Sequence, residues 1–240
     1  MNQIKPYSES LSKKQEVEAM FNNVASTYDQ VNRIISFYVD IYWRKVLINL
    51  LKKQAPKNIL DVATGTGDLA ISLAKENSVT VTGFDLSQKM LDVAKQKVIK
   101  EKLQNKVNFI HGDAENMPFQ ANEFDAITAS FGVRNFENLE KGLMEMNRVL
   151  KPDGILYILE FSQPTNYFFK KIYFFYFTKV LPFVGGLISK DKKAYTYLPN
   201  SVYNFPYGNQ MLSLLNKTGF KDSRFITLTF GISSIYIAKK

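Results

Sequence analysis

The 240-residue sequence contains no cysteine and only one histidine, His111. Disulfides, thiolate metal sites and a cysteine nucleophile are therefore excluded, as is a multi-histidine metal site. Long uncharged runs are absent too: the longest apolar stretch, around Ile172–Ser189, is interrupted by Lys179, so no membrane-spanning segment is expected. The polar first sixteen residues show no signal-peptide or transit-peptide pattern. We expect a cytoplasmic protein without a bound metal.

Positive charge is in excess, because Lys and Arg number 31 and Asp and Glu number 22, a net charge of +9. This balance favours an anionic partner: nucleic acid, an anionic membrane surface or a small anionic ligand. The sequence shows no separate basic module and no RNA-reading fold, and its aromatic residues cluster beside aliphatic ones rather than among arginines. A nucleic-acid partner is therefore disfavoured.

Apolar spacing predicts helices before Pro56 and an alternation of strands and helices after it. Strands are expected at Asn58–Val62, Val79–Phe84, Val107–His111, Phe124–Ala129 and Ile155–Glu160. The helices between them are expected at Asp68–Lys75, Ser87–Lys100 with Ser87 as cap, and Leu139–Leu150 with a turn at 151–154. Such alternation implies a parallel sheet covered on both faces, so the predicted fold class is α/β.

The alternation breaks after residue 162. Residues 163–207 are dense in aromatic and basic side chains, and we interpret them as an inserted helical lid. A helix at Gln210–Thr218 and strands at Phe220–Thr229 and Ser233–Ala238 follow, and the strands form an antiparallel hairpin at the sheet edge. The prediction is one domain with a Rossmann-like, seven-stranded, mostly parallel sheet. Its parts are an N-terminal helical cap (1–55), a cofactor-binding core (57–162), the insertion (163–207) and the final helix and hairpin (208–240).

A glycine-rich turn, Thr64–Gly67, joins the first strand to its helix. Glycines let the backbone approach a ligand, and the helix N-terminus offers free N–H groups. Taken alone this is weak evidence, because the segment also satisfies a loose dinucleotide-binding pattern.

Acidic residues after the first three strands narrow the interpretation to an S-adenosylmethionine site. Asp61, Asp85 and Asp113 converge on one edge of a parallel sheet. They suit the amino group or sulfonium, the ribose hydroxyls and the adenine amino group, respectively. The predicted cofactor-binding residues are Asp61, Thr64, Gly65, Thr66, Gly67, Asp85, Leu86, Asp113, Ala114 and Ser130. The alternative is a structural turn with solvated loop acids.

Three blocks carry a resemblance to a known family: Met20–Arg33 with Trp43-Arg44 after it, Ser130–Asn135, and Leu159–Pro164. They resemble the class I S-adenosylmethionine-dependent methyltransferases and, within these, the demethylmenaquinone and ubiquinone C-methyltransferase family. The chain departs from that family where a histidine usually precedes the Trp-Arg pair, because Tyr42 stands there. A histidine base at that place is therefore absent.

The resemblance implies methylation of a ring carbon on a prenylated naphthoquinol, with S-adenosylmethionine as donor and no metal. The expected reaction converts demethylmenaquinol to menaquinol, the last step of menaquinone biosynthesis. A ubiquinone precursor or another prenylated phenol is the alternative acceptor.

Four residues of the resembling blocks are candidates for catalysis. Arg134 is the preferred cation for a quinol oxyanion, and Asn135 is a second hydrogen-bond donor. Tyr28 and Asp29 are candidates for a base or a lid. The alternatives are a loop-fixing ion pair for Arg134, and helix packing or capping for Tyr28 and Asp29. His111 is interpreted as structural, and 117–119 as packing against adenine.

The insertion suits a channel for a prenyl tail and a surface that faces a membrane. Its lysines outnumber its one acid, Asp191, by five, and they are Lys170, Lys171, Lys179, Lys190, Lys192 and Lys193. Peripheral contact with the inner face of a membrane is therefore expected. The alternative is an ordinary lid with a solvated face, and a homodimer stays open.

Overall fold

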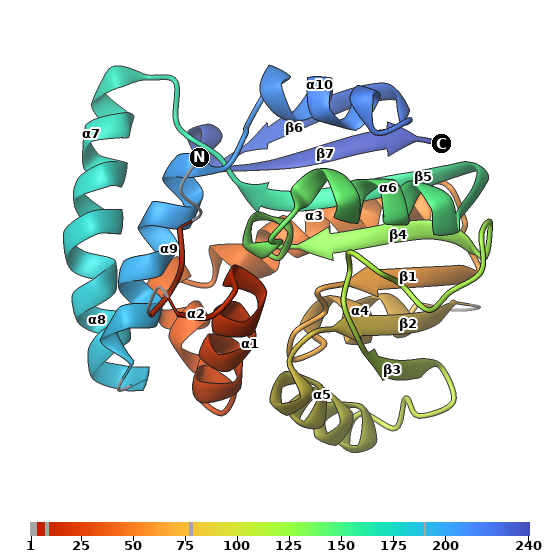
Figure 1. Ribbon diagram of the computed structural model, residues 1–240, viewed down its shortest axis with the longest axis horizontal. Helices are drawn as coiled ribbons and strands as arrows, with labels where there is room; N and C mark the ends of the chain where they lie inside the picture. The colour runs from red at the N-terminus through yellow and green to blue at the C-terminus, as the bar shows by residue number, and fades with distance from the viewer. Residues whose placement is uncertain (1–3, 8–9, 77–78, 190) are drawn as a thin grey trace.

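The computed structural model describes residues 4–7, 10–76, 79–189 and 191–240. Its centre is one seven-stranded sheet in the order β3-β2-β1-β4-β5-β7-β6. The first five strands in this order run parallel, β7 is antiparallel to β5, and β6 is antiparallel to β7. The strands are β1 (Asn58–Val62), β2 (Thr80–Asp85), β3 (Val107–His111), β4 (Phe124–Ser130), β5 (Leu150–Phe161), β6 (Lys221–Leu228) and β7 (Ser233–Lys239). The predicted fold class is confirmed (Figure 1).

Helices cover both faces of the sheet because neighbouring strand residues point to opposite sides. Ile59 packs into the cluster formed with α3 and α4, whereas the next residue, Leu60, packs into the cluster with α6 and α10. The covering helices are α3 (Val39–Lys52), α4 (Asp68–Ala74), α5 (Gln88–Lys100), α6 (Leu139–Val149) and α10 (Asn209–Lys217). The predicted cap of α5 is confirmed, since the Ser87 hydroxyl accepts a hydrogen bond from the Met90 amide at 3.2 Å.

Strand β5 differs from its prediction at its start. It begins at Leu150 and runs through residues 151–154, which the sequence predicted as a turn. Leu150 pairs with Phe124, and a register irregularity before Ala126 accommodates the extra residues. Asp153 takes up the local bend with φ +63°. Residues 151–154 therefore form an irregular first part of β5 instead of a turn between the helix and the strand.

The cap and the insertion form a layer of their own beyond the carboxyl ends of the parallel strands (Figure 1). Their apolar side chains share one cluster, which joins Val17, Met20 and Val31 of the cap to Tyr173 and Tyr197 of the insertion. The helices are α1 (Lys13–Val24), α2 (Tyr28–Ser36), α7 (Tyr167–Phe175), a π-helical turn (Tyr176–Val180), α8 (Leu181–Ser189) and α9 (Lys192–Asn204). The predicted helical insertion is therefore present, and it packs on the cap.

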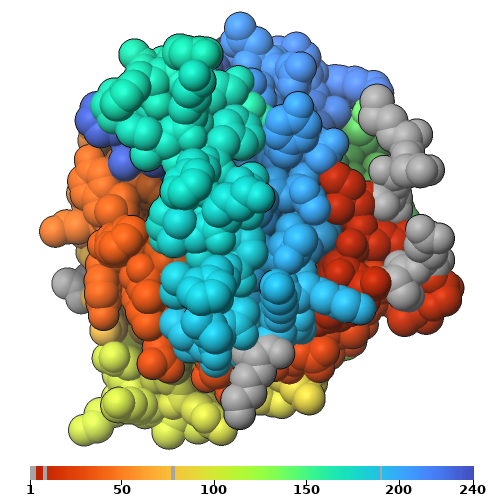
Figure 2. All heavy atoms as spheres, turned by 90° about the vertical axis from the view of Figure 1, so that its left-hand side faces the viewer, coloured from red at the N-terminus to blue at the C-terminus, as the bar shows by residue number. Residues whose placement is uncertain are grey.

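One feature of the insertion was not expected from the sequence. α7, the π-helical turn and α8 join into a single helix, Tyr167–Ser189, with a mean hydropathy of 1.4. By length and composition alone it could cross a membrane, and 28% of its most apolar window is buried. Lys179 interrupts the apolar run without interrupting the helix. Figure 2 shows this helix lying across one face of the molecule.

Candidate active site

A cavity of about 700 Å³ lies at the carboxyl ends of β1 to β4, and we call it the first cavity. The lining residues that the sequence predicted are Gly65, Asp85, Leu86, Asp113, Ala114 and Ser130. They come from four separate strand ends, which the sheet order brings to one edge. Helix α1 closes the cavity from the other side with Lys14, Val17 and Phe21.

The glycine turn is open to the first cavity at Gly65 and closed at Gly67. Gly65 has φ +56°, and among the described residues no atom lies within 4 Å of the place where a Cβ would stand. A Cβ on Gly67, at φ +78°, would lie 3.0 Å from Ala94 and Phe109. Gly67 therefore serves the packing of the turn against α5 and β3 and is not a wall of the cavity.

Three other predicted cofactor residues lie behind the wall. Asp61 is 1% exposed, and it accepts hydrogen bonds from the hydroxyls of Thr64 and Thr128, both at 2.6 Å. Burial raises the pKa of Asp61 to about 6, and the two hydroxyls oppose that rise. Thr66 donates to Asp29. None of Asp61, Thr64 and Thr66 lines the first cavity. Their hydrogen bonds instead hold the glycine turn in place from the side opposite the cavity.

Asp85 has a protein partner on each oxygen and still faces the first cavity. Its carboxylate accepts from the amides of Gly65 at 2.7 Å and Ser87 at 2.8 Å. Burial raises the pKa of Asp85, and these backbone N–H groups work against it. A carboxylate oxygen keeps a second lone pair, so Asp85 can accept from ribose hydroxyls as well.

Asp113 has a partner, Lys14, that the sequence did not suggest. Its carboxylate pairs with the Lys14 ammonium at 2.6 Å, so α1 is tied down over this end of the first cavity. Lys14 also reaches Glu115 at 3.4 Å. No spacing in the sequence links residue 14 to residue 113, so only the fold could reveal this contact.

A second cavity, of about 710 Å³, opens beside the first. Its walls come from α1, α2, α3 and α9, from the segment that follows β4 and from the last residue of β5. The two cavities share four lining residues, namely Phe21, Tyr28, Phe131 and Asn135. The remaining walls of the second cavity are mostly apolar and aromatic, and they include Trp43 and Phe161.

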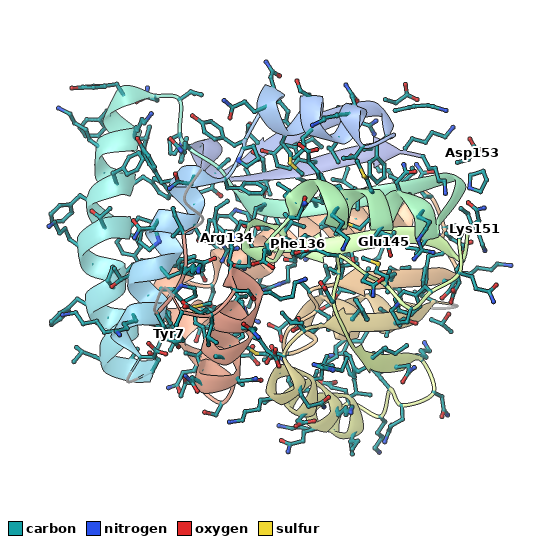
Figure 3. The ribbon with its side chains drawn as sticks, in the orientation of Figure 1. Tyr7, Arg134, Phe136, Glu145, Lys151 and Asp153 are labelled. Atoms are coloured by element: carbon teal, nitrogen blue, oxygen red, sulfur yellow. The ribbon has the colours of Figure 1, made fainter. Side chains whose placement is uncertain are left out.

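Arg134 lies in the wall of the second cavity, at the edge of the sheet that faces α9 (Figure 3). Its Nη1 donates to Glu160 at 2.8 Å and to the Phe131 carbonyl, and its Nε donates to the Ser201 hydroxyl at 3.3 Å. Burial raises the pKa of Glu160, and the Arg134 guanidinium opposes that rise. The loop-fixing ion pair is therefore present. Nη2 has no hydrogen-bond partner among the described residues, so its N–H groups are free to bind a ligand, while the guanidinium carbon lies 5.4 Å from the centre of the Phe161 ring.

Asn135 lines both cavities and is 6% exposed. Neither its amide oxygen nor its amide nitrogen has a hydrogen-bond partner in the described part of the chain, and the Ser130 hydroxyl is in the same state. Buried polar groups without partners are rare in native structures. These unpartnered atoms at the junction fit a site that a polar ligand completes.

Tyr28 and Asp29 face in different directions although they are neighbours. Tyr28 lines both cavities and meets the Phe21 ring edge-on at 6.0 Å. Burial raises the pKa of Tyr28, so it is a neutral phenol near pH 7. Asp29 lines neither cavity, because its oxygens accept from Thr66 and, at 2.8 Å, from Lys97. The structure does not support Asp29 as a base, since successive helix residues point about 100° apart.

Asp40 belongs to the second cavity and was not predicted from sequence. It is 4% exposed and is held by Ser36 at 2.7 Å and by the guanidinium groups of Arg33 and Arg44. Asp40 lies three residues before Trp43, in a block of the sequence that we considered only for the histidine missing from it.

The remaining candidates lie outside both cavities. His111 contacts the Leu86 carbonyl at 2.8 Å, which agrees with its structural interpretation. Phe119 packs edge-on against Phe84 and Phe124, and none of residues 117–119 lines the first cavity, so the packing of this segment against adenine stays a prediction. Within residues 4–7, 10–76, 79–189 and 191–240, no group of three or more acidic or histidine side chains could hold a metal. Independence from metal stays a prediction.

Residues 9–240 match the model of the ubiE/COQ5 methyltransferase family. The chain belongs to this family. The demethylmenaquinone methyltransferase of Bacteroides fragilis is 45% identical over 238 residues, covering 99% of this chain and 97% of that relative. That of Porphyromonas gingivalis is 41% identical, covering 99% and 98%. The ubiquinone/menaquinone biosynthesis C-methyltransferase of Geotalea daltonii is 43% identical, covering 95% and 97%. The family resemblance is confirmed, and the protein is a methyltransferase.

Solved structures agree on the fold. An S-adenosylmethionine-dependent methyltransferase from Thermotoga maritima gives a TM-score of 0.66 at 17% identity, covering 92% of this chain and 99% of the other. One from Aquifex aeolicus gives 0.57 at 22% identity, covering 80% and 87%. At these identities the likeness concerns the fold alone.

Proposed function

We propose that this methyltransferase transfers a methyl group from S-adenosylmethionine to a ring carbon of demethylmenaquinol, in the last step of menaquinone biosynthesis. The observation that carries the proposal is the pair of cavities that meet at Tyr28 and Asn135. The first offers carboxylates and a glycine turn, and the second offers aromatic walls with two cations, Arg44 and Arg134. The names of the relatives from Bacteroides fragilis and Porphyromonas gingivalis support the same acceptor.

The chain's own residues would bind and orient the reactants. When bound, S-adenosylmethionine supplies an electrophilic methyl group on a sulfonium. Asp85 would bind its ribose hydroxyls in the first cavity, and the turn at Gly65 would let the protein backbone approach it closely. The acceptor ring would lie in the second cavity, where Arg134 stabilises negative charge on a ring oxygen and makes the ring carbon more nucleophilic. That carbon would gain the methyl group as the methyl–sulfur bond breaks and leaves S-adenosylhomocysteine, and it would then lose its hydrogen as a proton to solvent, which restores the aromatic ring.

The deciding experiment is a methyl-transfer assay with the purified protein, S-adenosylmethionine and reduced demethylmenaquinone bearing a short prenyl tail. We expect a product heavier by one methylene, together with S-adenosylhomocysteine. A ubiquinone precursor and a simple prenylated phenol form parallel arms of the assay. Faster turnover of either one would replace the proposed acceptor with the alternative, and no turnover of any would overturn the proposal.

We also propose that the insertion contacts the anionic inner face of a membrane, from which a prenylated acceptor arrives. Large apolar side chains project from its long helix, and Tyr167, Phe168, Phe175, Phe183 and Leu187 are each at least 65% exposed. The described lysines among and after them are Lys170, Lys171, Lys179, Lys192 and Lys193, while Lys190 lies outside the described residues. Aromatic and basic side chains together complement an anionic lipid surface.

Vesicle flotation tests the membrane contact. We expect binding to vesicles with anionic lipid, less at high salt, because the Debye length is only about 10 Å at 0.1 M. Replacing Phe168 and Phe175 by serine should weaken binding, whereas Ile99→Ser, at a similarly exposed apolar position on α5, should not. Equal binding to neutral and anionic vesicles, or none to either, would contradict the electrostatic part.

A further inference from the structure

Helix α9 of the insertion reaches the Arg134 site through a face that presents two polar side chains. Ser201 accepts the hydrogen bond from the Arg134 Nε at 3.3 Å. Tyr197 lies four residues earlier, so it occupies the same face one turn away. Tyr197 lines the second cavity, whereas Ser201 does not. The face of α9 that anchors Arg134 therefore also places a phenol in the wall of the second cavity.

The Tyr197 hydroxyl is buried and has no hydrogen-bond partner in the described part of the chain. The residue is 4% exposed. Burial raises the pKa of Tyr197 to about 12, so the hydroxyl keeps its proton at neutral pH. The Arg134 cation lowers this pKa slightly and the Glu160 carboxylate raises it slightly, so the hydroxyl lies near that ion pair. Leaving such a group unpaired costs stability, which is unusual unless a ligand satisfies it.

We propose that the Tyr197 hydroxyl, together with the Asn135 amide, binds the ring oxygens of the acceptor, so that the insertion takes part in recognising a hydroquinol. The proposal rests on the function proposed above. Both groups can donate and accept hydrogen bonds, so they can serve an oxygen before and after it loses its proton. A donated hydrogen bond from Tyr197 beside Arg134 favours the ionised, more nucleophilic form of the ring.

Two neighbouring tyrosines sharpen the assignment. Tyr195 also lines the second cavity, and its buried hydroxyl has no hydrogen-bond partner among the described residues, but the groups that shift its pKa are Tyr28, Ser189 and Asp191 and do not include Arg134. Tyr173 is buried and unpartnered near Arg134 and Glu160, yet it does not line the second cavity. Tyr173→Phe is therefore a matched control, because it removes a similar hydroxyl from the same insertion.

The test compares Tyr197→Phe with Tyr173→Phe in the full chain. We expect Tyr197→Phe to lower kcat/KM for reduced demethylmenaquinone by about 10- to 150-fold, the range for a lost hydrogen bond to a charged group. S-adenosylmethionine affinity should stay unchanged, and the melting temperature should stay equal or rise, because an unpaired buried hydroxyl is gone. The acidic limb of the pH–rate profile should move to higher pH, since the bound quinol would ionise less readily. Tyr173→Phe should stay within about twofold of the parent.

A binding measurement separates this inference from the proposed function. Trp43 is the only tryptophan and lines the second cavity, so quenching of its fluorescence by short-tailed demethylmenaquinone reports acceptor binding directly. An inactive parent would count against the proposed function. An active parent with parent-like kcat/KM and quenching in Tyr197→Phe would overturn the role of Tyr197. Equal losses in both variants would overturn it too, because they would show a structural effect only.

Discussion

The first and second cavities share four residues, yet they are held in different ways. The carboxylates of the first cavity already have partners: Asp85 accepts two backbone amides, and Asp113 pairs with Lys14. The second cavity is mixed: Arg134 and Asp40 are held by protein partners, whereas the Tyr197 hydroxyl and the Asn135 amide have none among the described residues. The first cavity is therefore a polar site whose carboxylates are already held in place, whereas the second is a largely aromatic cavity that keeps some polar atoms free to bind a ligand. Damage to one should leave binding in the other largely intact.

The largest expected effect is on turnover, from a change in the second cavity. Arg134→Ala should lower the methyl-transfer rate by about 10²- to 10³-fold, the usual cost of losing one group that stabilises an oxyanion. S-adenosylmethionine binding should persist, because Arg134 does not line the first cavity. Arg134→Lys should recover part of the loss, since lysine keeps the charge but not the planar fork. Single-turnover measurements between about pH 6 and pH 10 would check this.

The control for Arg134→Ala concerns Glu160, which would be left buried without its cation. Adding Glu160→Gln to Arg134→Ala removes that unpaired carboxyl and should restore stability without restoring turnover. Parent-like single-turnover rates in Arg134→Ala would reduce Arg134 to a loop-fixing ion pair. The search for a catalytic group would then turn to Tyr28, because Asp29 is turned toward Thr66 and Lys97.

A smaller effect is expected on binding, from a change in the first cavity. Asp85→Ala should weaken S-adenosylmethionine binding by about 10- to 150-fold, the range for hydrogen bonds to a charged group. Quenching of Trp43 by the acceptor should be unchanged, because Asp85 does not line the second cavity. Calorimetric titration measures the first quantity and fluorescence the second. Asp92→Ala, which removes an exposed carboxylate from α5, is the control and should alter neither.

The first cavity was largely predictable from sequence because the end of a strand can be recognised from the few residues around it. Gly65, Asp85 and Asp113 each follow an apolar strand, and the rule that parallel strands end at one edge places them together. The sequence could not tell which side chains of the turn face inward. Asp61 and Thr66 belong to the same motif, yet the structure turns both away from the first cavity.

The second cavity was predicted less well because its walls are far apart in the chain. Arg134 and Tyr28 were proposed from the motif resemblance. Glu160, which pairs with Arg134, was predicted only as the last residue of a strand. Asp40 and Tyr197 come together only when the cap packs on the insertion. Such contacts depend on tertiary packing, for which local periodicity carries no signal.

The smallest effect on binding is expected from a change at Asp61. This change tests whether Asp61 only supports the glycine turn or also contacts the ligand. Asp61→Asn should change S-adenosylmethionine affinity by no more than about twofold, because Asp61 does not line the first cavity and Asn keeps one acceptor for the two hydroxyls. An affinity loss as large as that of Asp85→Ala would instead place Asp61 among the ligand-binding residues.

Stability should respond to Asp61→Asn, and its pH dependence carries a definite sign. The pKa of Asp61 is about 6 in the folded protein against an ordinary value of 3.8, so the native state holds this proton to higher pH than the unfolded state does. The parent therefore loses stability as the pH rises from about 4 to about 6, on the order of 2 kcal/mol, and does not regain it above that range. Asparagine cannot ionise, so the stability of the variant relative to the parent should increase over the same interval. Urea denaturation at about pH 4, 5, 6 and 7 measures this difference. A constant difference across the series would mean that Asp61 ionises normally and that its burial beneath the glycine turn is not the cause we assign.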